Sequence, residues 1–342
     1  MQLGCFNIAA CFNISAITMD KFIPNIKKKY QEKLINREKQ WPPCHLDKLV
    51  RLELVERRKG EVHSANLRRG QKDDSVKRTP LAYYDLFKVQ GRMKPVRKVL
   101  VEGDAGIGKT CLCTSIAEDW ADGKLFQQFE LLLLLPLRET EVAKAHTLRD
   151  LLVLFHSSSD VCNSVVSYLE EGEGENVLIV ADGWDELSVS ERQKKSFLSR
   201  LLVGSELPFL SVILTSRFSA SAALYDFPCI DRFAEVHGFS GENIKEYIQL
   251  EYADDQEKAD RLSEQLESNP LIDSICAVPL NCAIVCHLWR TLEEALPTTM
   301  TELYTKIILN VVLRNVHKIP EYEEILSLPN FDALPEDLQP SW

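Results

Sequence analysis

The chain has 342 residues, of which 45% are hydrophobic and 27% charged, and its formal net charge is -11. This is the composition of a soluble protein with a sizeable buried core, and the length favours two or three domains. Ten cysteines are scattered along the chain. Their scatter indicates reduced thiols and excludes a disulfide framework, so we expect a cytoplasmic protein with free cysteines.

Residues 1–19 carry no charged side chain. They lack the basic start of a signal peptide, and polar residues such as Asn7 and Asn13 interrupt the apolar run too often for a membrane-spanning helix. No other segment approaches the length of a span. We therefore expect residues 1–19 to be a disordered N-terminal segment, and we expect no membrane partner.

Residues 20–98 are basic, with 22 Lys and Arg against 10 Asp and Glu, whereas the rest of the chain carries 18 against 41. Such a basic front can bind nucleic acid or anionic lipid. It lacks, however, the interleaved aromatic residues of a surface that stacks on bases, so we do not expect nucleic acid as a partner. Docking onto the acidic body of its own or of a partner chain is the alternative.

We interpret residues 20–95 as a short basic α/β N-terminal extension that contains a helix, a short strand and a loop. Apolar residues at helical spacing predict one amphipathic helix over residues 25–41, which a proline pair ends. Residues 49–55 alternate like a short strand, and the polar stretch 57–78 has the composition of a surface loop.

Residues 103–110 read Gly-Asp-Ala-Gly-Ile-Gly-Lys-Thr, a complete G-x-x-x-x-G-K-[ST] phosphate loop. An apolar strand over residues 96–101 precedes it and a helix over residues 111–120 follows it, which is the context that the motif requires. In such a loop, backbone N–H groups point at phosphates, the lysine reaches the terminal phosphates and the hydroxyl after it holds Mg²⁺. The predicted nucleotide-binding residues of the loop are Gly103, Asp104, Ala105, Gly106, Ile107, Gly108, Lys109, Thr110 and Cys111.

A second strand delivers the acid that a phosphate loop needs. Residues 177–181 are an apolar run, and Asp182 follows them directly. A carboxylate at the end of a neighbouring strand organises Mg²⁺ in such sites. We therefore assign Asp182, together with Thr110, to the metal.

Three further residues are the predicted catalytic groups. Asp185 and Glu186 come shortly after the metal acid, and one of them can orient or deprotonate a water for attack on the γ-phosphate. Arg217 follows the buried strand over residues 210–215. Its guanidinium can distinguish a triphosphate from a diphosphate, because it pairs with the charge of the terminal group.

Strand-like and helix-like stretches alternate between residues 96 and 238, which is the signature of parallel strands covered by helices on both faces. The predicted strands are 96–101, 130–137, 177–181, 210–215 and 233–237, and the predicted helices are 147–155, 161–169 and 191–202. The fold class is therefore α/β, a three-layer parallel sheet of the P-loop NTPase type. Beyond residue 238 the pattern is helical, with Ser240 as the first N-cap.

These motifs in this order resemble the NACHT module of NOD-like receptors, within the STAND P-loop ATPases. The sequence Asp-Gly-Trp-Asp-Glu over residues 182–186 is the most discriminating part, since many other phosphate-loop proteins have one acid there. The helical segment adds Val278-Pro279-Leu280, and the resemblance implies that Pro279 packs near the adenine base. Ala277 departs from related apoptotic ATPases, which carry glycine two residues before that proline.

The resemblance also implies how the chain is divided. Residues 96–238 would be the NACHT nucleotide-binding domain, residues 239–296 helical domain 1, and residues 297–342 an incomplete winged-helix region. We find neither a death-fold effector domain nor leucine-rich repeats, so we expect a gene fragment, a truncated isoform or a decoy rather than a full receptor.

The function that the resemblance implies is an ATP/ADP switch with Mg²⁺ in innate-immune-type signalling. The ADP form would be closed, exchange to ATP would open the module, and opened protomers would oligomerise, with slow hydrolysis as a timer. The upstream ligand and the downstream effector stay open. Two alternatives remain: a catalytic P-loop ATPase or kinase with fast turnover, and a truncated decoy that only binds nucleotide.

Overall fold

The computed structural model describes residues 19–32, 52–57, 79–88, 94–193, 196–204, 206–226, 229–291, 296–297, 299, 301–306 and 308. The chain divides into two compact units, Met1–Gly238 and Phe239–Trp342. Among the described residues, no helix combines the length and the apolar character that crossing a membrane requires.

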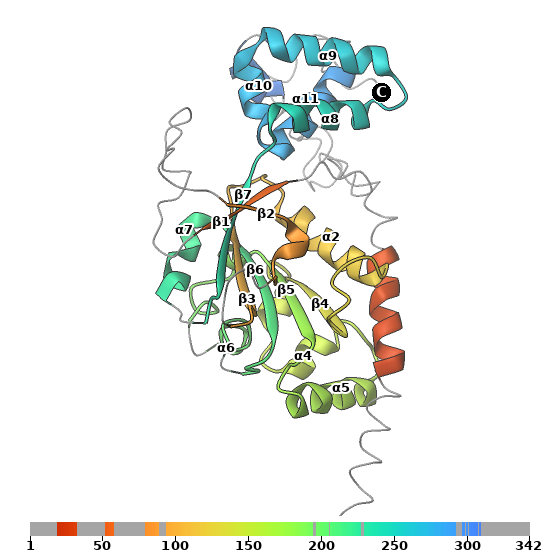
Figure 1. Cartoon of the computed structure of the whole chain (residues 1–342), viewed down its shortest axis with the longest axis vertical. Helices are drawn as coiled ribbons and strands as arrows, with labels where there is room; N and C mark the ends of the chain where they lie inside the picture. The colour runs from red at the N-terminus through yellow and green to blue at the C-terminus, as the bar shows by residue number, and fades with distance from the viewer. Residues whose placement is uncertain are drawn as a thin grey trace, which may run out of the picture. The chain divides into compact units, whose positions relative to one another are not determined.

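The first unit is built on one sheet of seven strands in the order β2-β1-β7-β3-β6-β5-β4 (Figure 1). The strands are β1 (Glu53–Arg57), β2 (Thr79–Leu81), β3 (Lys98–Glu102), β4 (Leu131–Pro136), β5 (Val177–Asp182), β6 (Ser211–Ser216) and β7 (Arg232–His237). The five strands from β7 to β4 run parallel, as predicted. All residues of β3, β5 and β6 are buried, which explains why their sequences are nearly continuous apolar runs.

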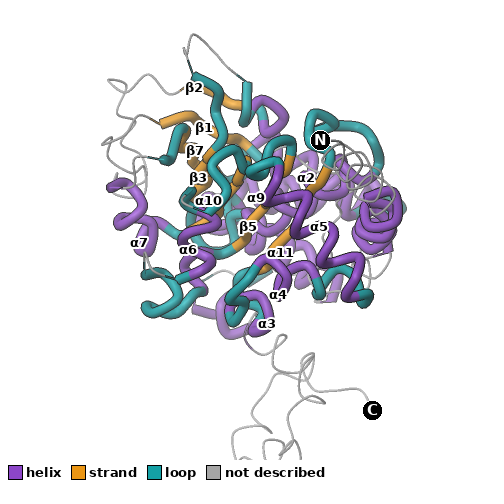
Figure 2. The backbone as a smooth tube through the Cα atoms, turned by 90° about the horizontal axis from the view of Figure 1, so that it is seen from below, coloured by secondary structure: helices purple, strands orange, loops and turns teal. Residues whose placement is uncertain are grey.

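The predicted α/β fold of the P-loop NTPase type is confirmed, but the sheet is wider than the five strands predicted for it. β1 pairs antiparallel with β7, and β2 pairs antiparallel with β1. Figure 2 shows β2, β1, β7 and β3 in succession across the sheet. The N-terminal extension is therefore part of the main sheet, and the predicted strand over residues 49–55 begins later, at Glu53.

Short helices connect the strands of the first unit. They are η3 (Tyr83–Asp85), α2 (Lys109–Ala121), α3 (Thr140–Ala143), α4 (Leu148–Leu152), α5 (Ser159–Glu171), η4 (Trp184–Glu186), α6 (Phe197–Leu202), α7 (Phe218–Ser221) and η5 (Ala222–Asp226). α2 packs against β4 and β5, and α4 packs against α5. Trp120, buried on α2, donates its indole N–H to the carbonyl of Phe129 (2.9 Å).

One predicted helix was wrong at its start. We predicted a helix over residues 191–202, but α6 begins at Phe197, where Ser196 caps it by accepting from the N–H of Ser199 (3.1 Å). Glu191 instead accepts from the backbone N–H of Ser188 (2.7 Å). Side chains that bond to nearby backbone groups favour such a turn over a helix.

The helix over residues 19–32 lies beside α2 and is drawn red in Figure 1. Met19, which falls in the segment predicted to be disordered, is helical. Residues 1–18, and residues 33–41 of the predicted helix, lie outside the described part. Met19, Phe22, Ile26 and Tyr30 are buried at helical spacing in the core of the first unit. The Tyr30 hydroxyl donates to the carbonyl of Leu132 (3.2 Å) and accepts from the N–H of Leu134 (2.8 Å), both on the edge strand β4.

Replacing Tyr30 by phenylalanine should lower the free energy of unfolding by about 1–3 kcal/mol, because two buried backbone groups of β4 lose their partner. Urea denaturation followed by tryptophan fluorescence measures this. The control is Tyr168→Phe, since the Tyr168 hydroxyl bonds to Glu130 (2.5 Å) at the surface; we expect a loss below about 1 kcal/mol there. Equal losses in the two variants would contradict the role of Tyr30 at the sheet edge.

Arg232 at the start of β7 joins the extension to the sheet. Its side chain is fully buried and pairs with Glu56 of β1 (Nε to Oε1, 3.2 Å). Its two terminal nitrogens donate to the carbonyls of Asp85 (2.8 Å), Leu86 (2.5 Å) and Lys88 (2.9 Å). One guanidinium therefore holds both β1 and the turn after β2 against the sheet.

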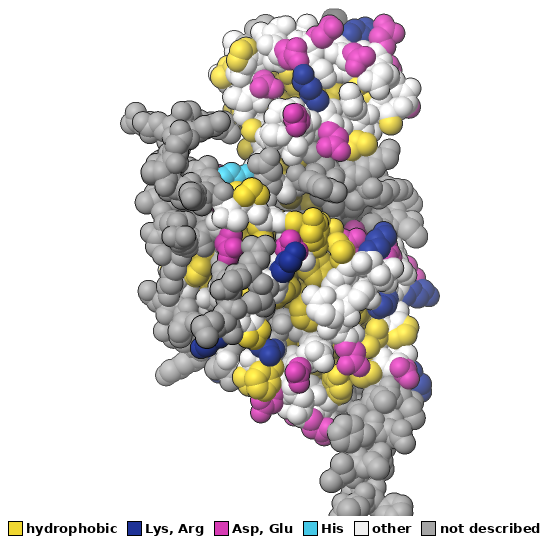
Figure 3. Space-filling model, in the orientation of Figure 1, with side chains coloured by type: hydrophobic (Ala, Val, Ile, Leu, Met, Phe, Trp, Pro, Cys, Tyr) yellow, Lys and Arg dark blue, Asp and Glu magenta, His cyan; other side chains and the backbone are white. Residues whose placement is uncertain are grey.

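The second unit is helical. It contains α8 (Gly241–Glu251), α9 (Gln256–Ser268), α10 (Pro270–Cys276) and α11 (Pro279–Thr291), with a further helix at residues 301–306. Ser240 caps α8 as predicted, by accepting from the N–H of Asn243 (3.2 Å). On the face shown in Figure 3, acidic side chains predominate over basic ones in this unit. Most of the predicted winged-helix region, from residue 309 onward, lies outside the described residues.

Candidate functional site

The phosphate loop connects β3 to α2 in the predicted way. Gly106 and Gly108 have φ angles of 74° and 104°, a left-handed conformation in which any other residue would be strained. The N–H groups in the first turn of α2 have no acceptor within the helix, as at every helix start. A glycine loop that ends on free N–H groups and a positive helix terminus fits a polyphosphate.

Leu52, from the N-terminal extension, packs against the phosphate loop at Gly108, and the sequence did not predict this contact. A Cβ atom on Gly108 would lie 2.7 Å from Cδ1 of Leu52, the residue just before β1. A Cβ on Gly103 would lie 2.8 Å from Cγ2 of Ile107. Ile107 is itself buried, so within the loop it contributes backbone and packing rather than a side chain for the ligand.

Lys109 is held by its own loop. Its Nζ donates to the carbonyls of Gly103 and Asp104, at 2.8 Å each. Partial burial lowers the pKa of Lys109, Asp185 and Asp182 oppose this, and Arg217 adds to it. A phosphate would replace these two carbonyls with acceptors that carry full charge, which strengthens the hydrogen bonds of an ammonium group.

Asp182 ends β5 and is buried, at 7% exposure. Its Oδ1 accepts from the hydroxyl of Thr215 on β6 (2.8 Å), and the Sγ of Cys113 on α2 lies 3.7 Å away. The N–H of Gly183 in turn donates to the Thr215 hydroxyl (2.9 Å). Residues of β6 and α2 therefore hold the Asp182 carboxylate through Oδ1. Its Oδ2 would be the atom that binds a metal ion or a water molecule of the metal's hydration shell.

The residues fit Mg²⁺ of the kind that phosphate loops bind. In the described part of the chain, no three His, Cys, Asp or Glu side chains come together as a metal site. Mg²⁺ commonly takes one or two protein oxygens and completes its shell with water and phosphate. Thr110, exposed in the first turn of α2, and Asp182 would supply those oxygens, and the ion would neutralise phosphate charge.

Both carboxylate oxygens of Asp185 contact Arg217, one through the guanidinium and one through the backbone N–H. Nε of Arg217 lies 2.9 Å from Oδ2 of Asp185, and the backbone N–H of Arg217 donates to Oδ1 (3.1 Å). The arginine side chain is 54% exposed and the aspartate 12%. Solvent can therefore reach the guanidinium although its partner is nearly buried.

Glu186 lies on η4, beyond the left-handed residue Gly183 (φ 92°). A Cβ on Gly183 would lie 2.8 Å from Oε2 of Glu186, and the positive φ of this residue is one that other residues rarely adopt. Partial desolvation raises the pKa of Glu186 although its side chain is exposed at the surface, and the charge of Asp182 acts in the same direction. Arg138, beyond the end of β4, lowers the pKa. A carboxylate with a raised pKa is a better proton acceptor for water. Arg138 belongs to none of the sequence motifs that mark the site.

The predicted site residues of the first unit lie at one edge of the sheet. β3, β6 and β5 are parallel neighbours, so the loop after β3, Asp182 after β5 and Arg217 after β6 follow the same ends of the strands. Pro279 belongs to the second unit, at the first position of α11. Its predicted contact with the adenine base remains a prediction.

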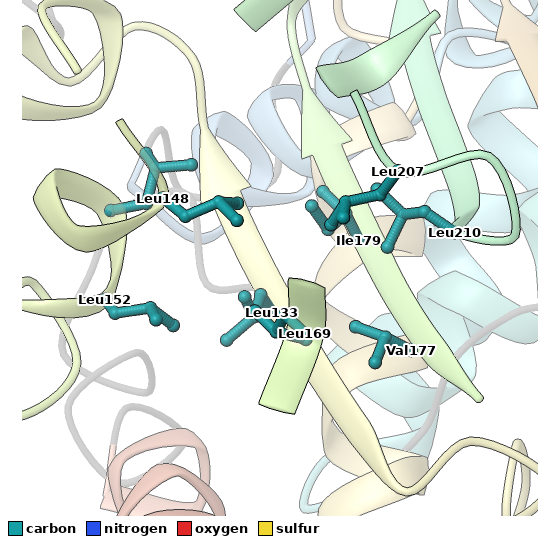
Figure 4. Close-up of a pocket in the computed structure, with 9 residues that line it drawn as sticks. Leu133, Leu148, Leu152, Leu169, Val177, Ile179, Leu207 and Leu210 are labelled. Carbon is teal, nitrogen blue, oxygen red and sulfur yellow. The ribbon is translucent and has the colours of Figure 1, made fainter. Parts of the chain in front are cut away.

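A pocket elsewhere in the first unit does not belong to this site (Figure 4). It is lined only by aliphatic side chains of β4, β5 and the segments around them: Leu133, Leu148, Leu151, Leu152, Leu169, Val177, Ile179, Leu207 and Leu210. Its volume is about 10 Å³. A void of one water's size without polar groups stays dry, so we regard it as a packing defect of the core.

Comparison with known proteins places this site in a family. The sequence profile of the NACHT domain matches residues 97–256. The chain is 31% identical over 225 residues to NACHT, LRR and PYD domains-containing protein 12 of Homo sapiens, which covers 61% of this chain and 21% of that protein. It is 32% identical over 211 residues to NACHT, LRR and PYD domains-containing protein 3 of Mus musculus (57% and 20%). It is 27% identical over 235 residues to Protein NLRC3 of Mus musculus (62% and 22%). The aligned part spans about a fifth of the length of these relatives.

Proposed function

Because this chain carries a NACHT domain and so belongs to the NACHT family of P-loop NTPases, we propose that it is an ATP/ADP-dependent conformational switch. The ADP form is closed, and ATP with Mg²⁺ opens the module so that copies of it assemble through the NACHT domain. By analogy with its relatives, the setting is innate-immune-type signalling in the cytoplasm. The activating ligand and the downstream effector are not identified by the residues of the site.

The observation that carries this proposal is the pair between Arg217 and Asp185, at 2.9 Å. The guanidinium is bound to a carboxylate of the second acidic motif, and a γ-phosphate would compete for it. A phosphate at the end of the triphosphate would draw Arg217 away and release Asp185. ADP, which lacks that group, would leave the pair in place. This gives the site two states that differ by one phosphate.

Slow hydrolysis follows from the same arrangement. Asp185 or Glu186 must orient or deprotonate the attacking water, and Asp185 is occupied by Arg217 until the guanidinium moves. Glu186, whose raised pKa suits proton transfer, is exposed to solvent. An active site that is open to water loses much of the electrostatic stabilisation that fast phosphoryl transfer requires.

The test measures how the site distinguishes ADP from ATP. Purified protein is denatured, the released nucleotide is identified by chromatography, and affinities for ADP and ATP are measured by displacement of a fluorescent nucleotide. Arg217→Ala should weaken ATP binding about 10-fold to 100-fold, the worth of one charged hydrogen-bonding group, and leave ADP binding nearly unchanged. Lys109→Ala should weaken both nucleotides.

The matched control is Arg200→Ala, because Arg200 of α6 pairs with Glu206, just after that helix, at 2.8 Å and both side chains are partly exposed; neither affinity should change. A loss of ADP and ATP affinity by the same factor in Arg217→Ala would argue against a γ-phosphate sensor. Multiple turnovers per second by the isolated chain would instead favour the catalytic ATPase or kinase, for which Glu186 is the candidate base. Permanent retention of ADP without exchange would favour the decoy.

A further inference from the structure

Lys98, the first residue of β3, is an unusual buried cation at the sheet edge opposite the phosphate loop. The residue is 4% exposed, and nothing in the described part of the chain hydrogen-bonds to its Nζ. The charge of Asp231 favours the charged amine, but Asp231 makes no hydrogen bond to Nζ. The Oδ2 of Asp231 accepts from the backbone N–H groups of Arg97 and Lys98, at 2.9 Å each.

Cys229 lies close to the buried amine of Lys98, on the other side of Gly204. A Cβ atom built on Gly204, after the end of α6, would lie 3.4 Å from Cε and 3.8 Å from Nζ of Lys98. The same point lies 3.5 Å from Cβ of Cys229. The amine of Lys98 and the Cβ of Cys229 therefore lie on either side of the position that a side chain at residue 204 would occupy. That position is empty because residue 204 is glycine. Cys229 is partly exposed, whereas Lys98 is buried.

Burial makes the amine of Lys98 a better nucleophile and the thiol of Cys229 a slower one, because the thiolate is the form that attacks a peroxide. Burial lowers the pKa of Lys98 to about 8, so a useful fraction of the amine is neutral and nucleophilic near physiological pH. Burial raises the pKa of Cys229, and the positive charge of Lys98 opposes that shift. Asp231 favours the charged amine and Arg97 the neutral one.

We propose that Lys98 and Cys229 form an oxidation-sensitive amine–thiol site, which a peroxide converts to a covalent S–N cross-link. In the first step the Cys229 sulfur attacks hydrogen peroxide; an S–O bond forms, the O–O bond breaks, and one water leaves. In the second step the Lys98 nitrogen attacks the sulfenic sulfur; the S–N bond forms, the S–O bond breaks, and a second water carries away the amine proton. The protein loses two hydrogens, and one peroxide becomes two waters.

The cross-link would act on the strand that carries the phosphate loop. It ties the first residue of β3 to the segment that leads into β7, next to the existing hydrogen bond from Asp231 N–H to the Lys98 carbonyl (2.9 Å). It also removes a buried positive charge that has no hydrogen-bond partner among the described residues. Both effects stabilise the first unit, so the oxidised form should unfold at a higher temperature than the reduced form.

The test is peptide mass spectrometry of the full chain after brief treatment with hydrogen peroxide, digested without reductant. We expect one cross-linked species that contains Lys98 and Cys229, lighter than the two peptides together by two hydrogens and reversed by dithiothreitol. Cys229→Ser and Lys98→Met should both abolish it. Lys124→Met, which removes a lysine exposed at the surface, should leave it intact.

A second readout separates a reacting pair from two unrelated residues. Dimedone traps sulfenic acid, and its labelling of Cys229 should rise several-fold in Lys98→Met, because no amine consumes the intermediate. The proposal is overturned if peroxide leaves Lys98 unlinked and converts Cys229 only to sulfinic acid or to a disulfide. It is equally overturned if dimedone labelling is the same with and without Lys98.

Discussion

Replacing Arg232 by methionine should lower the free energy of unfolding of the first unit by about 3–5 kcal/mol, because it breaks a buried ion pair from one side. Glu56, 17% exposed, loses the guanidinium that faces it. The carbonyls of Asp85, Leu86 and Lys88 lose the same donor. Methionine fills much of the space but donates nothing, so each group must find water or remain unsatisfied. The measurement is urea denaturation followed by the fluorescence of the buried Trp120 and Trp184.

Two further variants make this result specific. Lys245→Met removes a lysine that is 57% exposed and pairs with Glu267, itself 62% exposed, at 2.6 Å; exposed pairs contribute little, so its cost should stay far below that of Arg232→Met. Adding Glu56→Gln to Arg232→Met should restore part of the loss, because the unpaired charge is then gone. If Arg232→Met costs no more than Lys245→Met, the extension is not held by this side chain.

The central strands and the site could be predicted because their chemistry is local in sequence. Lys109 follows the apolar strand β3 within one loop, Asp182 ends β5, and Arg217 follows β6. Parallel strands in one layer end at the same edge, so position after a strand was enough to bring these side chains together. No long-range contact had to be known.

The width of the sheet could not be predicted in this way. β1 pairs with β7 in the register Leu54 to Val236, and no local pattern specifies a pairing over that separation. One sequence feature did point to it: Arg232 is a charged residue at the start of an otherwise mostly apolar strand, and buried charges need partners. The contact of Leu52 with Gly108 and the charge of Arg138 near Glu186 likewise depend on segments that are distant in sequence.

Lys98→Met should have the opposite sign to Arg232→Met and raise the free energy of unfolding by roughly 3 kcal/mol at pH 7, with Cys229 kept reduced. The pKa of Lys98 falls from 10.5 to about 8 on folding, first because of burial. The folded state therefore disfavours the charged amine, and methionine removes that cost while keeping an apolar stem of similar length. The contrast with Arg232 arises because Arg232 has four acceptors and Lys98 has none among the described residues.

The difference in free energy of unfolding between Lys98→Met and the wild type should depend on pH. Below pH 8 the lysine is charged in both states, so the wild type bears the whole penalty and the difference from Lys98→Met is constant. Between pH 8 and 10.5 the unfolded chain binds more protons than the folded chain, so the wild type gains stability relative to the variant as pH rises. The difference should therefore shrink across this window. Urea denaturation of both proteins at pH 7, 8, 9 and 10 measures it, and Lys124→Met, a surface change, should show no such trend. A difference that stays constant with pH would mean that packing, and not the charge of Lys98, separates the two proteins.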